Sequence, residues 1–140
     1  IGSLALAGTL GGTGTLTAAT TTLDGAIVNA NLGTGTLVQH SGISLLGGTA
    51  ASGIVRIDGG TLRLGGTDRL ADGAAVTVAR GATLDLQGFG ASVATLALAG
   101  TLTGTGTLSA ASYMLDGATV NANLGTGTLV QNSGVSVLHG

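Results

Sequence analysis

Five residue types are missing from this 140-residue chain: cysteine, proline, tryptophan, lysine and glutamate. Without cysteine the chain has neither a disulfide framework nor thiolate chemistry. The lack of proline and of a strict three-residue glycine period excludes collagen. Aromatic residues are limited to Phe89 and Tyr113. A large globular core would therefore be unusual, whereas a thin aliphatic layer repeated along an axis fits the composition.

Charge is equally sparse. Four arginines and six aspartates give a net charge of −2. Nucleic-acid binding requires clustered basic residues, so we expect no nucleic-acid partner. The uncharged stretches 1–23 and 117–140 are interrupted by Gly, Thr or Ser every two or three residues, so we expect no direct membrane insertion. Disorder is also excluded, because 44% of the residues are hydrophobic and only 7% are charged.

The chain repeats itself at a fixed offset of 92 positions. Residues 1–48 align without a gap on 93–140, with 35 identities in 48 pairs, and residues 49–92 lie between the two copies. Repetition at a fixed offset is typical of stacked, elongated architectures. No signal peptide is visible, and the chain begins and ends inside its own repeat. We therefore expect residues 1–140 to be a single solenoid segment cut from a longer protein.

A shorter period lies within the long one. Thr-Leu pairs begin at positions 15, 36, 61, 83, 107 and 128, so successive pairs are about 21–25 residues apart. Four such steps make up the 92-residue unit, so we expect about six coils averaging 23 residues, the period of a β-solenoid. If each pair holds the same place in its coil, one continuous internal ladder forms from Leu16, Leu37, Leu62, Leu84, Leu108 and Leu129.

Local patterning predicts strands. TLRL at 61–64, TLDL at 83–86 and VTV at 76–78 alternate apolar and polar residues with period two. Asp-Gly pairs, which favour turns, separate such segments, and no stretch has a sustained helical period. Stacking would give parallel, in-register strands about 4.8 Å apart. Arg63 and Asp85 then occupy the same slot in consecutive coils, so we expect them side by side on the outer surface.

One segment carries a resemblance to the passenger repeats of bacterial autotransporters: GGTLRLGGTDRLADGAAVTVARGATLDLQGFGASVATL at 59–96. The flanking LDGATVNANLGTGTLVQNSG at 115–134 is similar to coils of filamentous-haemagglutinin-like exoproteins. The resemblance implies a right-handed parallel β-helix that is exported through a Gram-negative outer membrane. It also implies display at the cell surface, or secretion, as an adhesin stalk or fibre.

No catalytic, cofactor-binding or metal-binding residues are predicted. The two histidines, His40 and His139, are each replaced in the other copy, by Asn132 and Gly47. The aspartates occur singly and do not follow the tandem G-G-x-G-x-D spacing of calcium-binding solenoids. Eight of the ten charges lie between Arg56 and Asp85 and alternate in sign, which indicates surface pairing rather than a carboxylate pair for catalysis.

We therefore expect a non-enzymatic stalk or fibre segment of an extracellular adhesin. Its expected partners are neighbouring repeats of the same chain, together with surface glycans or proteins, or further copies of itself. Two alternatives stay open. Thr-Gly-Thr at 13–15, 34–36, 105–107 and 126–128 resembles the threonine arrays of ice-binding solenoids, so the chain could present an ice-binding or carbohydrate-binding face. A self-assembling fibre subunit is the other alternative, because solenoid ends expose unpaired strand edges.

Overall fold

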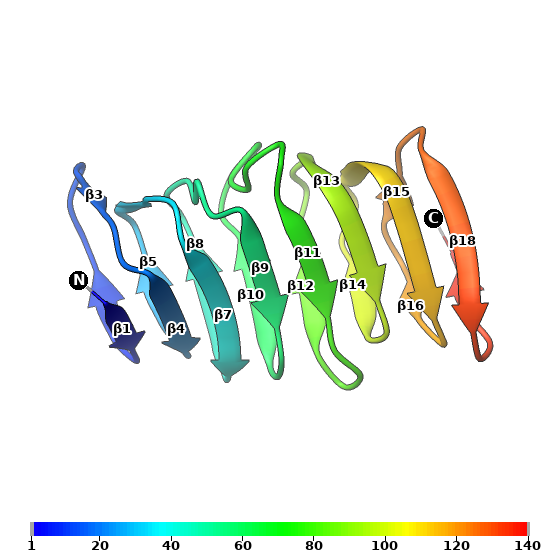
Figure 1. Ribbon diagram of the computed structural model, residues 1–140, viewed down its shortest axis with the longest axis horizontal. Coiled ribbons are helices and arrows are strands. Elements are labelled where there is room, and N and C mark those ends of the chain that lie inside the picture. Colours follow the sequence, from blue (N-terminus) through cyan, green and yellow to red (C-terminus); the bar gives the residue numbers. More distant parts are fainter. Residues whose placement is uncertain (1, 140) are drawn as a thin grey trace.

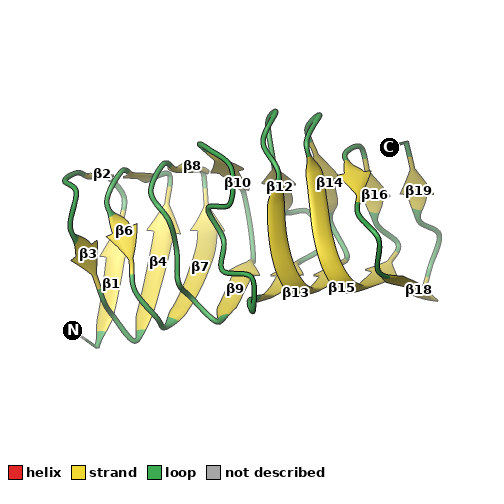
Figure 2. Ribbon diagram, turned by 90° about the horizontal axis from the view of Figure 1, so that it is seen from above, coloured by secondary structure: helices red, strands yellow, loops and turns green. Residues whose placement is uncertain are grey.

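The computed structural model describes residues 2–139, and these residues form strands and loops without any helix. The chain winds into coils that lie side by side along one axis, with its two ends at opposite ends of the stack (Figures 1 and 2). Strands in neighbouring coils pair in parallel throughout the described residues. The predicted fold class, an all-β parallel solenoid, is confirmed.

One long side of the stack, called here the first face, is a sheet whose strands recur once in each of eight coils (Figure 1). Two of its strands, β13 and β15, also extend around a corner onto another side. In chain order the strands are β1 (Ser3–Leu6), β4 (Thr20–Asp24), β7 (Thr36–Ser41), β9 (Ile54–Ile57), β11 (Ala75–Val78), β13 (Ala91–Leu98), β15 (Thr107–Asp116) and β18 (Thr128–Ser133).

The other two sides carry shorter strands (Figure 2). The second face comprises β2 (Thr9–Leu10), β5 (Ile27–Val28), β8 (Ile43–Leu46), β10 (Thr61–Leu64), β12 (Thr83–Asp85), β14 (Thr101–Thr103), β16 (Thr119–Val120) and β19 (Val137–Leu138). The third face is less regular. It comprises β3 (Thr15–Leu16), β6 (Asn31–Leu32), single-residue bridges at Ala50 and Leu70, the first parts of β13 and β15, and β17 (Asn123–Leu124).

The coils are shorter and more numerous than expected. The register of the first face aligns Ser3 with Thr20, Thr36, Ile54, Ala75, Thr95, Ser112 and Thr128, so one coil takes about 16–21 residues. The predicted fold of about six coils, each of about 21–25 residues, is therefore wrong in number. Residues 2–139 form eight coils, and the 92-residue offset spans five of them, from Ser3 to Thr95.

The error came from the Thr-Leu pairs, which lie on different faces. Those at positions 15 and 107 are on the third face, those at 36 and 128 on the first, and those at 61 and 83 on the second. Among neighbouring pairs of this series, Leu62 and Leu84 alone stack directly. The predicted single leucine ladder is therefore wrong. A Thr-Leu pair marks the start of a strand, and a regular coil contains one strand on each of the three faces.

The real core consists of several ladders, each formed by residues in register on one face. On the first face Thr21, Leu37, Val55, Val76, Leu96 and Tyr113 stack in this order. On the second face the ladder is Ser44, Leu62, Leu84, Leu102 and Val120. These side chains are at most 5% exposed. The period-two pattern places them inside because alternate strand residues point to opposite sides of a sheet.

A corner that recurs in both copies joins the first face to the second. The chain turns there at Gly25, Gly42 and Gly60, whose φ angles are 72°, 68° and 66°. Glycine adopts this left-handed conformation without steric cost. The amide of the buried Gln39 closes the turn from inside, because its Nε2 donates to the carbonyl oxygens of Ser41 (2.8 Å) and Gly42 (2.9 Å). Gln131 makes the same two bonds in the second copy.

Candidate functional site

The first cluster of chemically active side chains lies at the corner between the first and second faces. The Nδ1 of His40 and the hydroxyl of Ser41 both lie 2.8 Å from Oδ1 of Asp24, one coil away. The hydrogen bond from Ser41, followed by the one from His40, lowers the pKa of Asp24 below its usual value. Sequence reasoning had not joined these three residues. The sequence signal that could have indicated this cluster is that both copies contain an Asp-Gly segment and a Gln-x-Ser-Gly segment.

The arrangement differs from a hydrolytic triad. In a triad the histidine lies between the carboxylate and the serine, so that one ring nitrogen accepts the proton of the nucleophile. Here His40 and Ser41 donate to the same carboxylate oxygen, and the Ser41 proton is directed to Asp24. In the second copy Ser133 bonds to Asp116 at 3.0 Å, and Asn132 replaces the histidine. The shared chemistry is therefore a hydrogen bond that joins two coils.

The remaining candidates for metal ligation are dispersed. His139 lies in the last coil, where its backbone N–H donates to the carbonyl oxygen of Val120 (2.7 Å), whereas His40 lies in the third coil. Within residues 2–139 no group of three or more histidine and aspartate side chains is close enough to hold a metal ion.

The charged stretch is partly paired. Arg63 Nε and Asp85 Oδ2 are 3.2 Å apart, and the two residues are register partners in β10 and β12. The predicted contact between them is confirmed. A second ion pair joins Arg56 Nη2, near the end of β9, to Asp58 Oδ2, just after that strand, at 3.4 Å. Both arginines are exposed to solvent, and so is Asp58, whereas the Asp85 side chain is 17% exposed. Such surface pairs contribute at most about 1 kcal/mol each to stability.

The Thr-Gly-Thr motifs occupy two different kinds of corner. Those at 13–15 and 105–107 precede the third face, and those at 34–36 and 126–128 precede the first. They therefore do not form one array. A different set of threonines does stack in register, on the outer side of the second face: Thr61, Thr83, Thr101 and Thr119.

The first face presents a nearly uncharged outer surface. Two files of its outward residues contain Arg56 as their single charged residue, whereas Asp24 and Asp116, at the ends of β4 and β15, lie beyond these files at the corner. One file is Ser3, Thr20, Thr36, Ile54, Ala75, Thr95, Ser112 and Thr128; the other is Ala5, Thr22, Val38, Arg56, Thr77, Ala97, Met114 and Val130. Ile54 is 50% exposed and Met114 is 43% exposed. This surface suits a structural side of a fibre better than a site for ionic chemistry.

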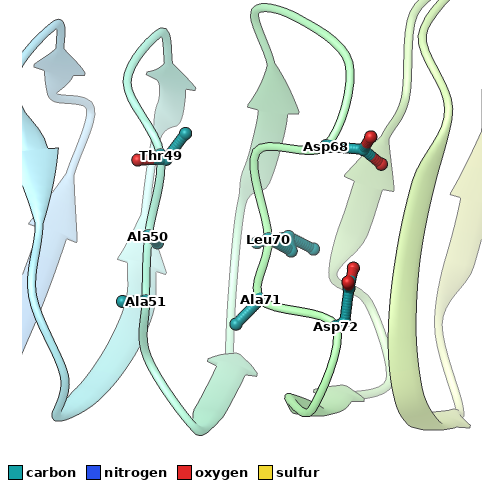
Figure 3. A pocket seen from close by; sticks show the side chains of 7 residues that line it. All are labelled: Thr49, Ala50, Ala51, Asp68, Leu70, Ala71 and Asp72. Atoms are coloured by element: carbon teal, nitrogen blue, oxygen red, sulfur yellow. The ribbon is translucent and has the colours of Figure 1, made fainter.

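A shallow open groove lies on the third face, between the third and fourth coils. It has a volume of about 340 Å³ and is lined by Thr49, Ala50, Ala51, Asp68, Leu70, Ala71 and Asp72 (Figure 3). The side chains of Asp68 and Asp72 project from the same side of their segment, one on either side of Leu70. Sequence reasoning missed this groove, because nothing in the spacing of two single aspartates indicates a shared depression.

Residues 2–139 contain no helix of the length and hydropathy needed to cross a lipid bilayer. No protein-family model matches the chain, and no solved structure matches it. The chain is similar to the Adhesin BmaC autotransporter of Brucella suis biovar 1 (strain 1330). The two are 35% identical over an alignment that covers 85% of this chain and 4% of the adhesin. The resemblance to autotransporter sequences is thus confirmed, and the chain spans about 4% of the curated relative it matches.

Proposed function

We propose that this chain is a stalk segment of a bacterial autotransporter adhesin, displayed outside the cell, whose task is to supply length and rigidity. The observation that carries the proposal is the uninterrupted succession of eight coils, each paired in parallel with the next. The similarity to the Adhesin BmaC autotransporter supports the same role.

The packing suits a rod. Each coil buries its leucines and valines against those of its neighbours, so the core continues along the axis. At the spacing of about 4.8 Å between strands, eight coils extend about 34 Å and a five-coil unit about 24 Å. Hydrogen bonds between coils, such as Ser41 to Asp24, tie the corners together.

The proposed role is structural rather than catalytic. In the one meeting of serine, histidine and aspartate among the described residues, the serine proton is directed to the carboxylate of Asp24 and not to the histidine. The lowered pKa of Asp24 makes this carboxylate a weak base. The charges of Arg56, Asp58, Arg63 and Asp85 are used in surface pairs.

The test is a deletion in the surface-displayed parent protein. Removing residues 3–94 deletes five coils and joins Gly2 to Thr95, the register equivalent of Ser3. We expect the displayed structure to shorten by about 24 Å in electron micrographs. Surface display, resistance to protease and β-rich circular dichroism should be unchanged, because the remaining coils still stack in register.

A matched control deletes residues 3–84, which joins Gly2 to Asp85, a residue of the second face, and breaks the register. This variant should lose protease resistance. If the in-register deletion also abolishes folding or display, the segment is not an interchangeable length of stalk. If display persists but adhesion disappears, the segment contains the receptor site and the stalk proposal is wrong.

A second candidate, ice binding, is supported by the in-register file Thr61, Thr83, Thr101 and Thr119. The neighbouring outward file contains Leu45, Arg63 and Asp85, which interrupt a regular threonine lattice. A thermal-hysteresis measurement on the purified segment separates the two functions, because a stalk segment produces no hysteresis. Replacing Thr83 with Tyr would abolish any hysteresis that depends on this file.

A further inference from the structure

Four aspartates of this chain are followed directly by glycine: Asp24, Asp58, Asp72 and Asp116. Because glycine has no Cβ, its nitrogen can approach the side-chain carboxyl carbon of the preceding aspartate closely. Attack there closes a five-membered succinimide ring, and hydrolysis of the ring gives aspartate or isoaspartate. The reaction requires a carboxyl group free of other partners and a backbone that can turn. The fold therefore decides which of the four pairs reacts.

The carboxyl groups of three pairs are held by neighbouring side chains. Asp24 and Asp116 each accept a hydrogen bond from a serine of the next coil, at 2.8 Å and 3.0 Å. Asp58 forms an ion pair with Arg56 at 3.4 Å. Among the described residues, the side chain of Asp72 makes no hydrogen bond or ion pair. Figure 3 shows this side chain projecting away from the opposite wall of the groove.

The glycines of the same three pairs are held as well. A Cβ added to the corner glycine of the next coil would lie 3.1 Å from the nitrogen of Gly25 and 3.2 Å from that of Gly117. The N–H of Gly59 donates to the carbonyl oxygen of Gln39 at 3.3 Å. Turning any of these peptides requires the corner to open first. Gly73 is exposed, and a Cβ added to it would meet no atom within 4 Å.

The remaining pair occupies an exposed turn. Asp72 and Gly73 are its two central residues, and the N–H of Ala74 donates to the carbonyl oxygen of Ala71 at 3.1 Å across it. The turn belongs to the connection between β10 and β11, and β11 begins only at Ala75. The peptide between Asp72 and Gly73 can therefore rotate without breaking a strand ladder.

We propose that the pair Asp72-Gly73 is the site at which this chain forms isoaspartate. The Gly73 nitrogen bonds to Cγ of the protonated Asp72 carboxyl, and the carboxyl hydroxyl leaves with the amide proton as water. A second water then adds to a ring carbonyl and breaks its bond to nitrogen. Opening at the main-chain carbonyl yields isoaspartate, which keeps one carboxylate and inserts one methylene into the main chain before β11. The reaction needs no co-reactant except water, and the adjoining strands keep their register.

The chain supplies internal controls for the test. Trypsin cleaves after arginine and releases the four pairs on four different peptides, 1–56, 57–63, 70–80 and 81–140. The folded chain is kept for weeks at neutral pH in water enriched in heavy oxygen, then unfolded and digested in ordinary water. Mass spectrometry measures the heavy oxygen that each peptide has gained, and electron-transfer fragmentation identifies isoaspartate.

We expect peptide 70–80 to convert at least about fivefold faster than the other three, because the other pairs react only after a corner opens. In guanidinium chloride the four pairs should convert at similar rates, since the selectivity comes from the fold. Equal rates at all four pairs of the folded chain, faster conversion at another pair, or conversion of 70–80 only in guanidinium chloride would each overturn the proposal.

Two glycine variants test the attacking atom. Gly73→Ala has room for its Cβ and should keep the circular dichroism of the unmodified chain. Its conversion at Asp72 should slow at least about fivefold, because a side chain beside the nitrogen hinders its approach. The matched variant Gly53→Ala, also in open space but preceded by serine, should leave the rate at Asp72 unchanged. An unchanged rate in Gly73→Ala, or equal slowing by both variants, would exclude attack by the Gly73 nitrogen.

Discussion

Tyr113 offers the sharpest test of the core, because it is a large polar side chain that is 1% exposed. Its hydroxyl accepts hydrogen bonds from the backbone N–H groups of Ala110 and Gly125, both at 2.9 Å. It also donates to the carbonyl oxygen of Leu108 at 2.8 Å. The hydroxyl therefore links two coils from inside the solenoid. The first copy has Thr21 at the equivalent position, one long repeat earlier.

The replacement Tyr113→Phe keeps the ring and removes only these bonds. Gly125 and Leu108 keep a partner, because the N–H of Gly125 also lies 3.0 Å from the carbonyl oxygen of Leu108. Ala110 then loses the partner of its N–H. A buried unsatisfied donor costs about 1–3 kcal/mol, and we expect the free energy of unfolding to fall by this amount. Replacing Tyr113 with Thr, as in the first copy, also creates a cavity and should cost about 3–5 kcal/mol.

Urea unfolding followed by circular dichroism measures both changes, with the slope against urea concentration expected to stay constant. The matched control is Ser112→Ala, which removes a hydroxyl from the outward neighbour and should change stability by less than about 0.5 kcal/mol. If Tyr113→Phe costs no more than this control, the buried hydroxyl does not stabilise the coils and the reasoning is wrong.

Three further predictions concern the ladder, the corner and pH. Leu84 is fully buried between Leu62 and Leu102, so Leu84→Ala should lower the free energy of unfolding by about 2–5 kcal/mol in the same assay; a loss below about 1 kcal/mol would contradict the assigned register. Gly42→Ala should destabilise the fold by at least about 1 kcal/mol, because the φ angle of Gly42 is 68° and an added Cβ would lie 3.1 Å from the Gly25 backbone. The control Gly53→Ala places its Cβ in open space and should not destabilise the fold. Equal melting temperatures of the two variants would refute the role assigned to Gly42. Folding lowers the pKa of Asp24 below its ordinary value of 3.8, so the stabilisation from its carboxylate should be complete at neutral pH and lost as the pH falls below about 4. The acid-unfolding curve of Asp24→Asn should lack this loss of stability. An acid-unfolding curve identical to that of the unmodified chain would exclude a stabilising role for the Asp24 carboxylate.

The alternation of apolar and polar residues was sufficient to predict strands, because a strand repeats every two residues whatever its neighbours are. The register of Arg63 with Asp85 was also predictable. Both belong to Thr-Leu segments on the same face, one coil apart, and stacking in register then leaves a single arrangement.

The coil period was not predictable in the same way. Leu16, Leu37 and Leu62 follow the same local motif but lie on three different faces. The sequence distance between successive members of this series is therefore one full coil plus part of the next coil. Which face a strand joins depends on the corner that precedes it, and corners are formed by contacts between coils. Gln39, for example, is a polar residue in a strand, and only the tertiary structure shows that its amide closes the turn from within.

By itself, the sequence determined that the chain is a repetitive, parallel, all-β stack with an aliphatic core, since composition and period-two patterning act locally along each strand. Only the tertiary structure decided that five coils make one long repeat and that Asp24, His40 and Ser41 meet at a corner. It also decided that Asp68 and Asp72 line one groove. In each case the residues are separated in sequence by a full coil or by an irregular loop. Stacking of the coils brings them together, and which residues meet depends on the length of each coil, which the local sequence pattern does not encode.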